Sequence, residues 1–180
     1  YGSFTEPRAQ GIGGDPSNAI RGGGAIELNT PLLKLAGLLQ ANGQSAIHTV
    51  ASWGSGSGGS ILLSVDRLEL GDKGRIEANG GALKLNECCQ AGGGGGGRIA
   101  INYKQLSHTG AQPVITAKGG ATNPWPTGTE QHGSAGTVYL NDLSNAKAEL
   151  IIDNTGLDKA RAATTLLDLG ETGELAAKLL

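Results

Sequence analysis

The side chains with the most distinctive chemistry in this sequence lie in glycine-rich stretches between apolar segments. They are two tryptophans, two histidines and two adjacent cysteines: Trp53, Trp125, His48, His132, Cys88 and Cys89. An indole at a protein surface can stack on the apolar C–H face of a sugar, while imidazole and thiolate bind transition metals. The two tryptophans and two histidines are therefore the candidate ligand-binding residues. The alternative for each tryptophan is that it covers the core under its own loop.

The histidines and cysteines do not have the spacing of a metal site, so we expect no metal and no cofactor. Cys88 and Cys89 are too few to define a disulfide framework. They are candidates for a vicinal disulfide or for a bond to a neighbouring chain, and the sequence does not choose between the two.

Nucleotide and nucleic-acid binding are not expected. The stretch GSGSGG, residues 54–59, satisfies G-x-G-x-x-G, but a strand pattern follows it instead of a helix whose N-terminus could receive a phosphate. A net charge of −2 gives no general attraction to nucleic acid or anionic membranes. No apolar run is long enough for a transmembrane segment.

Catalytic carboxylates also lack a recognisable arrangement. Polysaccharide lyases and hydrolases built on stacked strands need carboxylates, or carboxylates with Arg or Lys and calcium, clustered on one outward face. The outward positions expected here place Lys34 over Glu69 as an ordinary charge pair, and no position stacks two acids. We expect no enzyme, unless acids in loops, such as Glu87, Glu130 or Asp142, form a hidden site.

A repeat organises the chain. It appears as GGAIELN from Gly23, GGSILLS from Gly58, GGRIAIN from Gly96 and AGTVYLN from Ala135. The central branched residues recur after 35, 38 and 39 positions: Ile26, Ile61, Ile99 and Val138. Two further apolar pieces follow in each unit, for example LLKLAG from Leu32 and LLQANGQ from Leu38. A unit of this length is typical of a solenoid.

Each apolar piece alternates with period two, as half-buried strands do. The alternation predicts buried columns, one of them Leu39, Ile76 and Ile115, with small residues at one corner: Ala41, Ala78 and Ala117. Asn42 and Asn79 would stack beside that corner, and Lys118 would interrupt them. We therefore expect an all-β fold, a right-handed parallel β-helix (β-solenoid) with three short strands per rung. An antiparallel β-sandwich is the alternative.

The repeat divides the chain into three parts: a lead-in at 1–22, a β-helix repeat domain of about four rungs at 23–154, and a C-terminal cap or link at 155–180. Glycine-rich excursions leave the solenoid at residues 44–57, 81–95 and 121–134, and they hold most of the candidate binding residues. Insertions in repeat proteins gather on one face, so function is expected there. Strand and helix patterns compete after residue 154.

The phrases YGSFTEP, GGGAIEL, GGSILL, IEANGG, GGGGGGRIAI and AGTVYL resemble glycine-rich repeat segments of large secreted or surface-attached proteins, mostly bacterial. The resemblance covers roughly residues 1–154. It implies export and a modular place in a longer adhesin- or fibre-like chain, and it brings no catalytic residue with it.

We therefore expect a non-catalytic extracellular module, either a β-helical fibre subunit or a spacer. Its partners would be neighbouring copies or flanking modules of the same long chain, with a glycan as a further ligand. The alternatives are a carbohydrate-binding or carbohydrate-active, pectate-lyase-like β-helix and a phage receptor-binding fibre.

Overall fold

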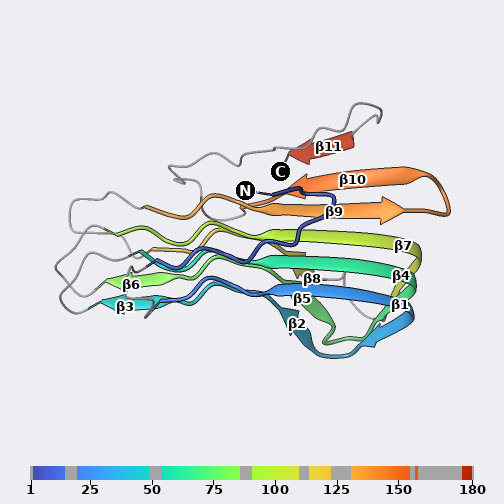
Figure 1. The fold of residues 1–180 in the computed structure, drawn as a ribbon, viewed down its shortest axis with the longest axis horizontal. Coiled ribbons are helices and arrows are strands. Elements are labelled where there is room, and N and C mark those ends of the chain that lie inside the picture. Colours follow the sequence, from blue (N-terminus) through green and yellow to red (C-terminus); the bar gives the residue numbers. More distant parts are fainter. Residues whose placement is uncertain are drawn as a thin grey trace.

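The computed structural model describes residues 2–14, 20–48, 54–85, 91–109, 114–122, 131–154, 157 and 176–179. All regular secondary structure in this part of the chain is β-strand, and the strands form three open sheets (Figure 1). The all-β class expected from the alternating pattern is confirmed.

The largest sheet contains three long parallel strands followed by three shorter ones: β1 (Ala25–Leu35), β4 (Ser60–Leu70), β7 (Arg98–His108), β9 (Thr137–Asp142), β10 (Lys147–Ile152) and β11 (Ala176–Leu179). A three-stranded parallel sheet contains β2 (Leu38–Gln40), β5 (Arg75–Glu77) and β8 (Val114–Thr116). A small parallel sheet contains β3 (Ala46–His48) and β6 (Leu83–Leu85), and Thr122 forms an isolated bridge to Leu83.

The chain visits these sheets in a fixed order. It passes from the six-stranded sheet to the three-stranded sheet and the two-stranded sheet, then returns to pair beside its own earlier strand. We call one such pass a circuit. The register joins Ile26 to Ile61, Ile61 to Ile99 and Ile99 to Val138, as the repeat predicts. Strands of successive circuits pair in parallel, so the antiparallel sandwich does not fit. Only the β9–β10 pair is antiparallel in the described residues.

The long strands each contain a bend where the sequence predicts a break between two strands. Pro31, Asp66 and Lys104 have no partner in register, although the residues on both sides of them are paired. In β1 the core-facing side chains are Ile26 and Leu28 before the bend and Leu33 and Leu35 after it. The prediction of three separate strands was wrong at this point, because the first two form one continuous strand that bends.

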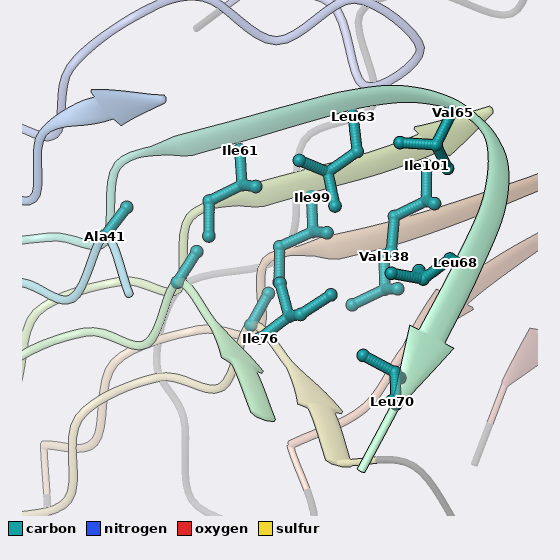
Figure 2. Close-up of a cluster of buried hydrophobic side chains, with 12 residues drawn as sticks. Ala41, Ile61, Leu63, Val65, Leu68, Leu70, Ile76, Ile99, Ile101 and Val138 are labelled. Carbon is teal, nitrogen blue, oxygen red and sulfur yellow. The ribbon is translucent and has the colours of Figure 1, made fainter. Parts of the chain in front are cut away.

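The core lies between the six-stranded and three-stranded sheets. Ile61, Leu63, Ile99 and Ile101 from the larger sheet are fully buried and meet Ile76 from the smaller one (Figure 2). The predicted small residues at the corner belong to the same cluster: Ala41, Ala78 and Ala117. Burying one such aliphatic side chain contributes about 1.5–3 kcal/mol. The aligned columns are thus a main source of stability.

The described parts of the glycine-rich excursions are hydrogen-bonded to one another, which the sequence did not predict. Outgoing arms (41–46, 78–83, 117–122) leave the three-stranded sheet, and returning arms (54–59, 92–97, 131–136) lead back to the six-stranded sheet. We call these arms together the glycine strip. Neighbouring returning arms are joined at every third residue, since the amides of Ser55 and Gly58 donate to the carbonyls of Gly92 and Gly95. A three-residue period with hydrogen bonds only between arms is the pattern of polyproline II segments.

Outgoing and returning arms are also bonded to each other. The amide of Gly59 donates to the carbonyl of Ala41 (2.8 Å), and that of Gly97 to Ala78 (2.6 Å). The two layers approach so closely that a Cβ on Gly58 would lie 2.1 Å from the carbonyl oxygen of Ala78. Glycine is needed here for space between backbones. The run of six glycines is thus a returning arm in contact with its neighbours.

A hairpin follows the fourth long-sheet strand. Asp142 at the end of β9 pairs with Lys147 at the start of β10, and Ala146 in the turn has a positive φ of 50°. The apolar stretch AELII, residues 148–152, forms most of β10. The parallel ladder is therefore followed at this end by an antiparallel strand.

Candidate functional site

His132 lies where the third circuit turns back toward the large sheet. The amide of Thr122 donates to its Nδ1 (3.0 Å), and the Thr122 hydroxyl accepts from the amide of Gln131 (3.1 Å). Because Nδ1 accepts, the neutral ring carries its proton on Nε2. The half-buried His132 therefore joins the outgoing arm to the returning arm.

His48 lies at the same end of the fold. It ends β3, which pairs with β6, and Leu83 of β6 bridges to Thr122. His48 thus belongs to the first circuit and His132 to the third, with β6 of the second circuit between their strands. The other candidates, Trp53, Trp125, Cys88 and Cys89, lie outside the described residues, and so do Glu87 and Glu130.

An open groove crosses three circuits just beyond the bend. Its volume is about 280 Å³, and its lining includes Lys34, Glu69 and His108, with Leu35 and Ala36 supplying apolar surface. The expected contact of Lys34 with Glu69 is confirmed, with 3.2 Å between Nζ and Oε2. We call this site the bend groove. The charged groups could hydrogen-bond to the polar groups of a ligand, and the apolar side chains could contact its apolar face.

Arg67 also contacts the bend-groove carboxylate, with 3.3 Å between its Nε and Oε1 of Glu69. Glu69 is therefore shared by two cations. In the described strands no acid is paired with another acid across a ladder. The described residues also contain no group of three or more His, Cys, Asp and Glu side chains that could hold a metal ion.

The predicted asparagine stack forms, with bonds from side chain to backbone. Asn42 Oδ1 accepts from the amide of Asn79 (2.7 Å), and Asn79 Oδ1 accepts from the amide of Lys118 (2.8 Å). Asn154 continues the pattern by accepting from the amide of Gly119 (2.8 Å). Lys118 ends the run of asparagines but remains a hydrogen-bond donor through its backbone.

Glu77 is a buried carboxylate beside this stack, and only 7% of its surface is exposed. It accepts a hydrogen bond from Asn42 Nδ2 (3.1 Å) and pairs with Arg75. The alternating pattern puts Glu77 on an outward position and does not predict its burial. Its contact with Asn42 joins it to the previous circuit and its contact with Arg75 lies within β5, so its role is structural.

The N-terminal segment, residues 2–14, crosses the outer face of the large sheet (Figure 1). Phe4 packs edge-on against Tyr139 of β9, with ring centroids 5.6 Å apart. Further along, the Arg8 guanidinium forms two 3.1 Å hydrogen bonds to the carboxylate of Glu27 in β1. The segment therefore spans the sheet from β9 to β1.

Between these two anchors lie Leu62 and Ala100, which occupy the same outward row as Glu27 and Tyr139. Both are buried although they point away from the core between the sheets. Sequence analysis treated the segment as a loop and missed this role. An apolar pair in a row expected to be polar was the available signal.

Hydrogen bonding lowers the pKa values of two carboxylates, Glu27 and Asp142. The bond from Arg8 holds the pKa of Glu27 below its ordinary value, and the same contacts raise the pKa of Arg8. The pKa of Asp142 is lowered first by the side chain of Asn145 in the hairpin turn. Burial raises the pKa of the Tyr103 phenol, with further repulsion from Asp142.

Comparison of the chain with protein-family profiles, curated proteins and solved structures found no match. Among the described residues no helix is long and apolar enough to cross a membrane.

Proposed function

We propose that the chain is a right-handed parallel β-helix that serves as a non-catalytic structural or adhesive module. The observation that carries the proposal is the register of β1, β4 and β7, in which each circuit lies directly on the next over the whole strand. Right-handed crossing is by far the commoner hand for parallel strands joined in this way. Such stacking makes a stiff body in which each circuit stabilises only its neighbours.

The glycine strip supports this role. Its backbone bonds join outgoing and returning arms, so the loops extend the stacked body instead of forming a free rim. A spacer or fibre subunit needs length and stiffness, and both come from such repetition. The resemblance of its phrases to glycine-rich surface proteins supports an extracellular place for the module, within a secreted or cell-surface assembly.

A carbohydrate ligand is the second candidate, and the bend groove favours it. Lys34, Glu69 and His108 come from three successive circuits and offer hydrogen-bonding groups beside the apolar Leu35 and Ala36. Sugars need this combination of polar contacts and apolar surface. Hydrolysis by paired carboxylates would need a second acid near Glu69, and Lys34 and Arg67 lie there instead.

Polysaccharide turnover tests whether the module is non-catalytic, as the first proposal states. The chain is incubated with neutral and uronic-acid polysaccharides while reducing ends and unsaturated products are measured, with Glu69→Gln as the matched variant. The structural role predicts no release above a protein-free control. Release that falls with Glu69→Gln would contradict it and establish a carbohydrate-active site.

A further inference from the structure

The first circuit presents an unpaired edge. Strands β1, β2 and β3 are each the terminal strand of their sheet, and all three belong to that circuit. The core-facing residues of β1 are only half-buried, whereas their partners in β4 are fully buried: Ile26, Leu28, Leu33 and Leu35 against Ile61, Leu63, Leu68 and Leu70. Leu38 in β2 is 49% exposed. We call this surface the open edge.

The described residues do not cover the open edge. The N-terminal segment reaches β1 across the outer face from β9, so it lies beside the sheet instead of beneath its first strand (Figure 1). At the opposite end, β9 is followed by the antiparallel β10. Two copies joined head to tail would therefore not continue the parallel ladder of the long strands.

The free backbone groups of β1 fall into two sets. The carbonyl of Gly24 accepts from the amide of Ser60, and the carbonyl of Leu35 accepts from Gly71. Backbone groups of successive strand residues point to opposite sides. Residues 25, 27 and 29 before the bend, and 32 and 34 after it, therefore point their backbone groups away from β4.

The backbone groups of one set can hydrogen-bond to those of the other when β1 pairs with the β1 of a second copy in antiparallel orientation. With a two-fold axis between Thr30 and Pro31, Glu27 lies opposite Lys34 of the second copy, and Asn29 lies opposite its Leu32. Both pairs would be hydrogen-bonded through backbone groups that point away from β4. The Leu32 carbonyl already accepts from the Thr30 hydroxyl (3.3 Å) and has a second lone pair for the new bond. Pro31, which has no N–H, falls opposite Thr30 in a pair that needs no hydrogen bond.

The side chains agree with the same register. Inward side chains have even residue numbers before the bend and odd numbers after it. In an antiparallel pairing, an even-numbered residue before the bend must therefore lie opposite an odd-numbered residue after the bend of the second copy. The register with Glu27 opposite Lys34 meets this condition, and it sets Ile26 against Leu35 and Leu28 against Leu33. The apolar core would then run without interruption from one copy into the other.

We propose that two copies of this chain pair through their open edges, with β1 antiparallel to β1 and Glu27 facing Lys34. The inference rests on the proposed structural function and names its partner as a second copy. Arg8 already contacts Glu27, and Glu69 already contacts Lys34, so the pairing joins them into a row of alternating charge. Such a two-fold contact is isologous and stops at two copies.

Sedimentation velocity and light scattering across a wide concentration range test the pairing. The unaltered chain is expected to approach twice its own mass at saturation. Lys34→Glu or Glu27→Lys places like charges opposite each other twice per dimer, and each is expected to weaken the dimer roughly tenfold or more. The double variant Glu27→Lys with Lys34→Glu restores opposite charges and should bind more tightly than either single variant.

A second variant tests the backbone pairing without changing charge. Asn29→Pro removes an N–H that points away from β4, so β1 can still fold as an edge strand while the dimer loses two hydrogen bonds. It should also weaken the dimer roughly tenfold or more. Lys104→Glu reverses an exposed cation of β7 and is expected to leave the dimer unchanged.

The outcomes are distinct. A single-chain mass at every concentration, or a dimer that ignores the variants at residues 27, 29 and 34, overturns the pairing and leaves the spacer role standing. Long filaments also overturn it, because a two-fold contact cannot propagate alone. A dimer that responds as expected but degrades polysaccharide keeps the pairing and overturns the proposed function.

Discussion

Gly94 lies directly against the backbone of Gly56, so that a Cβ at residue 94 would lie 1.9 Å from the carbonyl oxygen of Gly56. No side-chain rotation relieves this approach, because both groups belong to the backbone. Gly94→Ala must separate two arms of the glycine strip, and we expect a loss of about 3 kcal/mol or more in unfolding free energy. Urea or thermal denaturation followed by circular dichroism measures it.

The same glycine run contains its own control. A Cβ on Gly92 would lie 3.5 Å from the carbonyl oxygen of Gln131, which is an ordinary contact. Gly92→Ala should therefore change stability by no more than about 0.5–1 kcal/mol, in either direction. Equal losses for the two variants would contradict the close approach of the arms.

Asn79 connects two circuits through its side chain, and its removal should weaken that connection. Asn79→Ala leaves the amide of Lys118 without its acceptor, so we expect a loss of about 1–2 kcal/mol. Asn79→Asp keeps an acceptor oxygen and should lose less. Chemical denaturation compares the two with Gln105→Ala at an exposed position, and an Asn79→Ala loss no larger than that of Gln105→Ala would refute the role.

Ala146 adopts a left-handed conformation in the β9–β10 turn, with φ of 50°. L-residues with a Cβ are strained there by roughly 1–2 kcal/mol, while glycine is not. Glycine also makes the unfolded chain more flexible, which offsets part of this gain. Ala146→Gly should therefore stabilise the fold by up to about 1 kcal/mol. Ala148→Gly, inside β10, should destabilise it, and a thermal shift assay reads both signs.

The contact of Arg8 with Glu27 has a pH signature. Arg8 lowers the pKa of Glu27 in the folded state, so this contact contributes stability above the unfolded pKa of about 4.5, which is lost as pH falls through the folded pKa. Arg8→Gln should move the pKa of Glu27 up toward that ordinary value. Carbon-13 NMR of the carboxyl group follows the titration.

Arg67→Gln serves as the matched control for that titration, because Arg67 contacts Glu69 beyond the bend and not Glu27. It should leave the pKa of Glu27 where it is. A pKa of Glu27 that does not move with Arg8→Gln would show that the N-terminal segment is not held as described.

Sequence patterns predicted the columns of the fold better than its ends. Alternation identified the inward residues from Ile26 to Val138 because each column repeats at a fixed spacing. It divided the long strands at Pro31 because both residues at a bend face outward, which looks like a gap between strands. It missed β3 and β6 because three residues are too few to show a period.

The candidate site shows the same division. His48 and His132 were expected at one face, and the described backbone does place them at the same end of the fold. The bend groove was not expected, since it depends on Lys34, Glu69 and His108 meeting across circuits. Of these contacts, only that of Lys34 with Glu69, which joins equivalent positions of successive circuits, could be predicted from the spacing of the repeat. The N-terminal contacts of Phe4 and Arg8 join residues far apart in the chain, which no local pattern reveals.

The central claim is that circuits stack in parallel with the described register, and methyl NMR tests it most directly. In a sample with labelled isoleucine and valine methyl groups, we predict nuclear Overhauser contacts from Ile26 to Ile61, from Ile61 to Ile99 and from Ile99 to Val138. Amide contacts between β1 and β4 should advance in the same direction along both strands. Contacts that advance in opposite directions, or the absence of the Ile61 to Ile99 contact in a folded sample, would contradict the stacked architecture and the functions built on it.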